Sequence, residues 1–243
     1  VVGRSGTSIE LAARGPGTLI GDNAAHLFSV LSVPTTNLIP TAVPEDEDVS
    51  SLFASAVRLA VVCGVASASA QLLFGRQLLA RYTAKQSAAI AGPAFAYARV
   101  RAVGAPFAPL CKVSTATCLA SKDAITPLVA LFAGGVINLG LDILLVCGLG
   151  QGVAGAAAAT VVSEALVAAA LLASARRRLP GMKAVARRLT PSRKEVKTFA
   201  RYARPLVVTL LGKIAAYSTL AHVATADSVE ATAAHRIPMG LYW

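Results

Sequence analysis

The sequence is poor in charged and in aromatic residues. Of its 243 residues, 14% are charged and 5% aromatic, whereas 55% are hydrophobic and the mean hydropathy is +0.63. A soluble domain carries about 45–50% apolar and about 25% charged residues, so its polar surface is far larger. The composition therefore excludes an ordinary soluble domain and predicts a membrane protein. Alanine, valine, leucine and glycine supply most of the apolar surface, which suits helices that pack closely in lipid.

The sequence also lacks the motifs of soluble catalysis and of metal binding. It has no GxSxG, HExxH, P-loop or Rossmann fingerprint in context, so we expect no enzyme activity and no cofactor. The four cysteines lie in apolar stretches without CxxC spacing and are expected to be small buried hydrophobes. They are Cys63, Cys111, Cys118 and Cys147. No signal-peptide pattern precedes the first apolar segment, and both ends read as cuts, so we expect a longer protein.

Long apolar stretches predict about six membrane-spanning helices, because each span needs about 20 mainly apolar residues. Ala124–Ala175 is too long for one span and is predicted to form two, with a turn at the glycines of Gly148–Gly152. The other predicted spans are Pro16–Ala42, Leu52–Leu79, Val103–Ala120 and Pro205–Ala226. A further apolar stretch opens at Glu230. The fold class predicted from this pattern is an all-α polytopic membrane protein.

A strongly basic connector separates the fifth and sixth predicted spans. Arg176–Arg204 holds eleven lysines and arginines and one acidic residue, Glu195, which is +10 of the chain's net charge of +11. Beside membrane spans, such a block is typical of a cytoplasmic loop facing anionic headgroups rather than of a nucleic-acid site. We predict a linker with a short amphipathic helix at Met182–Thr190. This orientation puts the Gly148–Gly152 turn outside the cytoplasm and Ser121–Asp123 inside.

Asp142 is the most informative side chain, because it lies midway along a predicted span. A carboxylate costs about 2.5–3.5 kcal/mol at the centre of a membrane helix, and by default it marks an ion or proton pathway. Asn138 lies four residues earlier on the same helical face. Together they could coordinate Na⁺ through oxygen ligands, or Asp142 could carry a proton. The alternative is an aspartate hydrogen-bonded between helices for packing alone.

Several stretches, in order along the chain, resemble the MATE (multidrug and toxic compound extrusion) transporters, in particular the plant and algal branch. They are Val2–Arg4 (VGR), Glu10–Ala13 (ELAA), Phe28–Ile39 (FSVLSVPTTNLI), Tyr97–Pro106 (YARVRAVGAP), Ala120–Pro127 (ASKDAITP), Asn138–Asp142 (NLGLD), Gly152–Ala157 (GVAGAA) and Ala233–Ile237 (AAHRI). The resemblance implies a bundle of twelve helices in two lobes around a central cavity. Residues 1–175 would then form the N-lobe, 176–204 the linker, and 205–243 the start of the C-lobe.

The resemblance also implies functional residues. In archaeal members an asparagine and an aspartate at this spacing form a cation site with a threonine of the sixth helix, and Thr160 stands at the matching position. Many bacterial and animal members carry a glutamate near the point where this chain has Lys213, so a C-lobe carboxylate site is in doubt. Lys213 could bind an anionic substrate or serve as a counter-ion. Asn37 and Glu164 are further candidates for the substrate cavity, and Glu164 could also join the cation site.

Other polar groups in the predicted spans give weaker hypotheses. Asp22 and His26 lie one turn apart and could relay protons, although such a pair is more often hydrated near a membrane surface. His222 lies near a helix end and is expected to be solvated. Pro34 and Pro40 are expected to kink the second helix.

The resemblance implies a secondary antiporter that exports organic solutes or xenobiotics in exchange for H⁺ or Na⁺. The missing P-loop agrees with transport that is not driven directly by ATP. The implied partners are membrane lipid and a small organic solute, with no nucleic acid, and a transporter that is monomeric at full length. The plasma membrane, the vacuolar membrane and the plastid envelope all remain open as locations. A lipid-linked oligosaccharide flippase of the same superfold, an intramembrane enzyme and a nonfunctional truncated product are the alternatives.

Overall fold

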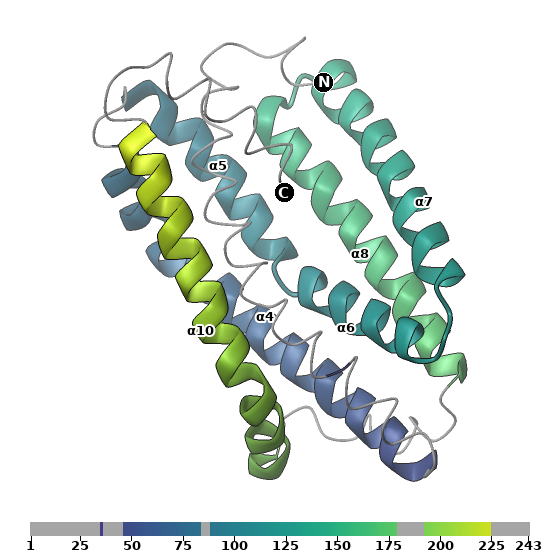
Figure 1. The fold of residues 1–243 in the computed structure, drawn as a ribbon. Helices are drawn as coiled ribbons and strands as arrows, with labels where there is room; N and C mark the ends of the chain where they lie inside the picture. Colours follow the sequence, from purple (N-terminus) through teal and green to yellow (C-terminus); the bar gives the residue numbers. More distant parts are fainter. Residues whose placement is uncertain (1–34, 36–45, 84–87, 179–191, 225–243) are drawn as a thin grey trace. The chain divides into compact units, whose positions relative to one another are not determined.

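The protein is built from helices throughout the part of the chain that the structure, a computed structural model, describes: Thr35 and residues 46–83, 88–178 and 192–224 (Figure 1). The elements are α4 (Asp46–Thr83), α5 (Ala88–Gly104), α6 (Phe107–Ala120), α7 (Ile125–Asp142), the π-helical turn η1 (Ile143–Gly148), α8 (Gly152–Arg178) and α10 (Arg193–Ala224). The chain divides into two compact units, Val1–Arg201 and Tyr202–Trp243. The all-α prediction is confirmed. The predicted span Pro16–Ala42 and the stretch opening at Glu230 lie outside the described residues.

Among the described residues, three helices are long and apolar enough to cross a membrane. They cover Ser51–Gln77, Ile125–Gly148 and Gly152–Arg177, which confirms the predictions of one span at Leu52–Leu79 and two within Ala124–Ala175. The apolar face of α7 is exposed over its whole length: Ile125 is 73%, Leu128 67% and Phe132 74% exposed. Such a face would be unfavourable in water, and lipid is the solvent that it fits.

The predicted span Val103–Ala120 is not one continuous helix, and its apolar part, Phe107–Ala120, is shorter than a membrane span. The helical region starts at Ala88 as α5, breaks after Gly104, and resumes at Phe107 as α6. The break falls at Ala105 and Pro106, where proline cannot donate a backbone hydrogen bond to the preceding turn. Two arginines in α5, Arg99 and Arg101, interrupt the apolar run, and for this reason the sequence pattern did not predict the helix that precedes the break.

The turn between α6 and α7 is a compact helix cap. The backbone N–H of Asp123 donates to the carbonyl of Cys118 (2.9 Å) and that of Lys122 to the carbonyl of Leu119 (2.9 Å), with Lys122 in the left-handed region at φ +59°. These two bonds define a Schellman motif, which satisfies the last carbonyls of α6. Asp123 then accepts from the N–H of Thr126 at 3.1 Å and so begins α7. The predicted turn at Ser121–Asp123 is confirmed.

The second predicted turn is also confirmed. Gly148 ends η1 and Gly152 begins α8, and Gly150 and Gly152 have φ values of +63° and +56°. Those conformations are strained for residues with a Cβ atom, and so the glycines allow the chain to reverse within three residues. The reversal places α8 antiparallel to α7.

Helix α8 is the centre of the first unit, in contact with α5, α6 and α7 (Figure 1). Its inner positions are small: Ala156, Ala157 and Ala159 are almost completely buried. Small side chains let neighbouring helices approach closely, which maximises van der Waals contact in lipid. A second cluster lies nearer the other end, where Phe53 of α4, Val113 of α6, Ala175 of α8 and Phe199 of α10 pack together.

Helix α10 begins at Arg193, earlier than the predicted span at Pro205, and Pro205 lies within it. Arg193–Arg204, predicted as part of the linker, is thus helical, and Arg176–Arg178 belong to the end of α8. The predicted amphipathic helix at Met182–Thr190 lies outside the described residues. The lobe boundaries at 175 and 204 stay predictions.

Candidate cation site

Asn138 and Thr160 meet at the contact between α7 and α8. The Asn138 side-chain amide Nδ2 donates to Thr160 Oγ1 at 3.4 Å, and Thr160 Oγ1 donates to the backbone carbonyl of Ala156 at 3.0 Å. The two residues are 22 positions apart, and the turn at Gly150 brings them together. The predicted proximity of these two side chains is therefore present in the structure. Amide and hydroxyl oxygens are hard ligands of the kind that alkali cations accept.

Close backbone approach lets these two short side chains touch. A Cβ atom at Gly155 would lie 3.2 Å from the carbonyl oxygen of Leu145, and one at Gly134 would overlap Cγ2 of Val167. Larger residues at these glycines would push α7 and η1 away from α8. The glycines on both sides of the Asn138–Thr160 contact therefore set the distance between the helices.

Asp142 lies one turn beyond Asn138, at the last position of α7. Its Oδ1 atom is buried and has no hydrogen-bond partner among the described residues. A buried carboxylate oxygen without a hydrogen bond is unfavourable, because it has lost contact with water. A bound proton or cation would remove that penalty. The π-helical turn η1 follows directly, and such turns are frequent at functional sites because they offset the helical register.

Glu164 lies one turn beyond Thr160 on α8 and forms an ion pair with Arg101 of α5. Arg101 Nη1 is 3.0 Å from Glu164 Oε2, and the two side chains are 10% and 27% exposed. The backbone carbonyl of Glu164 also accepts from Cys111 Sγ of α6 at 3.5 Å. Glu164 thus contacts both α5 and α6. Its assignment to the cation site or to a substrate cavity stays a prediction.

Arg101 is the member of this group that the sequence reasoning did not single out as a site residue. The signal was present: an arginine inside a helical membrane segment needs a counter-charge, and Glu164 is an intramembrane acid. Nothing in the order of the residues showed that the two would face each other, since 63 positions separate them.

The remaining predicted residues are placed only in part. Lys213 and His222 belong to α10, but the orientation of their side chains is not described. Asn37, Asp22, His26, Pro34 and Pro40 lie outside the described residues. The substrate-cavity assignments of Lys213 and Asn37 therefore stay predictions.

The chain that contains this candidate site has relatives among known proteins. No model of a known protein family matches the chain. The chain is 32% identical over 244 residues to Protein DETOXIFICATION 47, chloroplastic, of Arabidopsis thaliana, a match that covers 100% of this chain and 44% of that protein. The chain thus spans about half the length of this relative.

Two solved structures of MATE family multidrug resistance transporters of the MOP superfamily share the fold. The outward-facing one has a TM-score of 0.76 at 25% identity and covers 93% of this chain and 51% of its own. The inward-facing one has a TM-score of 0.76 at 26% identity and covers 95% of this chain and 54% of its own.

Proposed function

Since this chain belongs to the MATE family of membrane transporters, in its plant-type branch, we propose that it is part of a secondary antiporter. The transporter exports organic solutes or xenobiotics in exchange for H⁺ or Na⁺. The chain is an integral membrane protein, with three helices of membrane-spanning length among its described residues. Because the Arabidopsis relative is named as chloroplastic, a plastid envelope is the proposed membrane.

The observation that carries this proposal is the buried Oδ1 of Asp142 beside the Asn138–Thr160 contact. The three side chains offer a carboxylate, an amide and a hydroxyl, which are hard oxygen ligands for Na⁺. The carboxylate can alternatively hold a proton. Either ion neutralises the charge of Asp142, so ion binding changes the electrostatic energy of this part of the bundle.

Ion binding and solute export are coupled if the outward-facing and inward-facing states bind the ion with different affinity. A ligand shifts a conformational equilibrium only by its difference in affinity for the two states. The chain shares its fold with one outward-facing and one inward-facing transporter, the two states between which alternating access moves. Rocking of one such bundle against another is the usual form of alternating access.

The test is transport by the full-length protein in vesicles with an imposed pH or Na⁺ gradient. A fluorescent organic cation and labelled citrate serve as the two solutes. Asp142→Asn is expected to abolish gradient-driven movement, and the gradient that drives the unsubstituted protein identifies the coupling ion. Asp123→Asn is the matched control, because it neutralises a carboxylate in the α6–α7 turn and asparagine caps helices equally well. Unchanged gradient-driven efflux in Asp142→Asn would contradict the proposal.

A lipid-linked oligosaccharide flippase and an inactive truncated product are the other outcomes of this experiment. Movement of neither solute under either gradient would favour them. Among the described spans no specific observation favours the flippase.

A further inference from the structure

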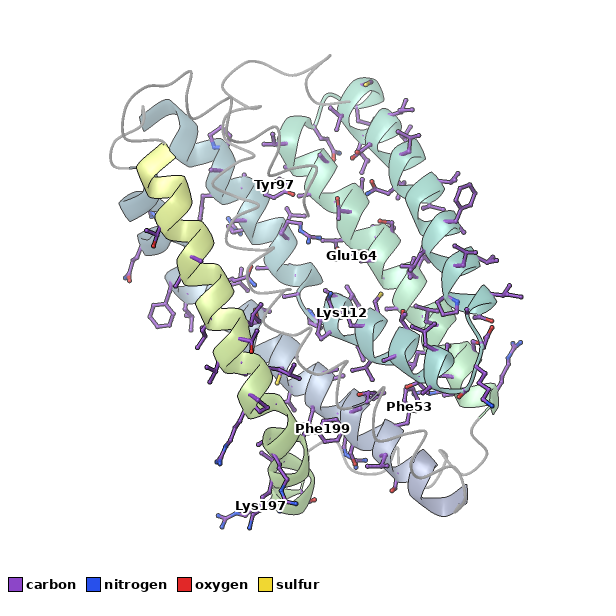
Figure 2. All side chains as sticks on the ribbon, in the orientation of Figure 1. Phe53, Tyr97, Lys112, Glu164, Lys197 and Phe199 are labelled. Atoms are coloured by element: carbon purple, nitrogen blue, oxygen red, sulfur yellow. The ribbon has the colours of Figure 1, made fainter. Side chains whose placement is uncertain are left out.

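The beginning of α10 lies at the level where two membrane spans end. Phe199 of α10 belongs to one packed cluster with Phe53 of α4 and Ala175 of α8, and Figure 2 shows it on the side of α10 that faces Phe53. The spans of α4 and α8 cover Ser51–Gln77 and Gly152–Arg177, so Phe53 and Ala175 each lie two residues inside an end of a span. Phe199 is therefore at the edge of the hydrocarbon layer rather than deep within it.

The face of α10 opposite Phe199 is basic. Arg193, Lys197 and Arg201 follow one another at intervals of four residues, so they share one face of the helix, and all three are exposed. Phe199 is two residues from both Lys197 and Arg201, which at 3.6 residues per turn puts it on the other side of the helix. Lys197 is accordingly turned away from the cluster (Figure 2). The side of α10 that does not pack on the bundle thus presents positive charge.

Lys197 and Arg201 lie at the depth of the lipid headgroups. A helix rises 1.5 Å per residue, so both are about 3 Å from the level of Phe199 along α10. The headgroup layer extends about 5–7 Å beyond the hydrocarbon on each side of a bilayer. Long cationic side chains keep their stems on apolar surface and extend their charge into this layer. The two cations therefore reach the layer from either side of the level of Phe199.

Helix α8 adds two cations at the same depth. Arg176 and Arg177 follow directly after Ala175, the α8 member of the cluster, and both are exposed. Cations at the end of a helix also offset its dipole, which stabilises α8 itself. Together with Lys197 and Arg201 they form a basic surface of four exposed side chains, with a charge of +4, from two helices that share one cluster.

The acidic beginning of α4 lies farther out. Asp46, Glu47 and Asp48 precede Phe53 by five to seven residues, so their backbone is about 8–10 Å from the level of Phe53 along α4. The headgroup phosphates are nearer in depth to the basic surface than these acids are. Pairing of the cations with the acids is the alternative to lipid binding, and the experiment below separates the two.

We propose that the basic surface binds the phosphate headgroups of anionic phospholipids. The fork of an arginine matches two phosphate oxygens, and a lysine pairs with phosphate as a point charge. The packing of Phe199 holds these cations at the depth where lipid phosphates lie side by side. This assigns lipid binding to one defined surface at the junction of α8 and α10, beyond the general attraction of a basic linker to a membrane. The proposal does not depend on the proposed antiport function.

The test compares the full-length protein in nanodiscs of phosphatidylcholine with the same protein in nanodiscs that also contain phosphatidylglycerol. The temperature of thermal unfolding is expected to be higher in the anionic nanodiscs by about 2 °C or more, because a ligand that binds only the folded state stabilises it. Replacing all four cations of the basic surface by glutamine should abolish this difference and leave the unfolding temperature in phosphatidylcholine nearly unchanged. Added salt should reduce the difference for the unsubstituted protein.

Two single variants form a matched pair on one side of the membrane. Lys197→Gln removes a cation of the basic surface, whereas Lys122→Gln removes an exposed cation of the α6–α7 turn, which lies on the side where α8 ends because α7 and α8 are antiparallel. Lys197→Gln is expected to reduce the difference between the two kinds of nanodisc, and Lys122→Gln to retain it. This pair decides if the fourfold variant does not fold. Equal reductions in both variants would mean diffuse attraction to the membrane and would overturn the proposal.

Two other results would also contradict it. If the cations pair with the acids of α4, the fourfold variant unfolds at a lower temperature in both kinds of nanodisc, and the difference between them persists. If the surface takes a soluble anion, inorganic phosphate in the buffer stabilises the protein in phosphatidylcholine as much as phosphatidylglycerol does.

Discussion

Pro106 occupies the space that a side chain at Gly64 would fill. A Cβ atom built on Gly64 of α4 would overlap the Cα of Pro106, at the break between α5 and α6. The contact is with backbone, so it cannot be relieved by turning a side chain. The bend between α5 and α6 therefore packs against α4 at a position where only glycine fits.

Gly64→Ala is expected to destabilise the protein, because α4 must move away from the bend. Overpacking of this kind costs about 1–3 kcal/mol. The temperature of thermal unfolding in detergent measures this loss of stability. Gly75→Ala is the matched control on the same helix, since no atom of the described residues lies within 4 Å of its Cβ position. Equal unfolding temperatures for the two variants would contradict the close packing of Pro106.

Thr160→Val should weaken binding of the coupling ion and leave the fold unchanged. Valine has the shape of threonine but lacks the hydroxyl that contacts Asn138. The loss of one polar ligand to a charged group is worth about 1.5–3 kcal/mol, or roughly tenfold to a hundredfold in affinity. Titration of the purified protein with the ion measures this change in affinity. Thr160→Ser is expected to bind normally, and so is Ser163→Ala, which removes the hydroxyl bonded to the Thr160 backbone carbonyl.

Lys122→Gly is expected to raise the unfolding temperature. Lys122 has φ +59° in the cap of α6, a conformation that costs a residue with a Cβ atom about 1–2 kcal/mol. Glycine adopts it freely and is the usual residue at this position of a Schellman motif. Lys122→Ala separates the effect of the charge on stability from the effect of backbone conformation, because it removes the ammonium group and retains the Cβ atom. If alanine stabilised as much as glycine, backbone conformation would not be the cause.

Phe132→Asp tests the lipid-facing side of α7. Phe132 is 74% exposed, and in water a charged residue at such a position would be tolerated. In a membrane the same change costs about 3 kcal/mol at the helix centre. We expect a large loss of the inserted protein from the membrane fraction. Phe132→Leu should insert normally, as should Lys122→Asp in the α6–α7 turn. Normal insertion of Phe132→Asp would mean that another protein surface, not lipid, covers this face.

Only part of the candidate cation site could be predicted from the sequence. Asn138 and Asp142 share a helix, and so their spacing of four alone places them on one face. Thr160 entered through family resemblance, and the structure then shows it in contact with Asn138. Arg101 was missed as a site residue, because a pattern of apolar residues treats an arginine as an interruption of a span. The ion pair with Glu164, which another helix supplies, compensates the charge of that arginine.

By itself the sequence determined the membrane class, the all-α fold, three of the spans and both tight turns of the first unit. These features are local: they follow from the length of apolar runs and from glycines, whose backbone freedom is a property of the residue. The tertiary structure decided that the helix breaks at Pro106, that Glu164 pairs with Arg101, and that Oδ1 of Asp142 has no hydrogen-bond partner within the described part of the chain. Those properties depend on contacts between helices that are distant in the sequence, such as Arg101 with Glu164 and Gly64 with Pro106. A charge in lipid is stable only beside its partner, and no single segment contains both.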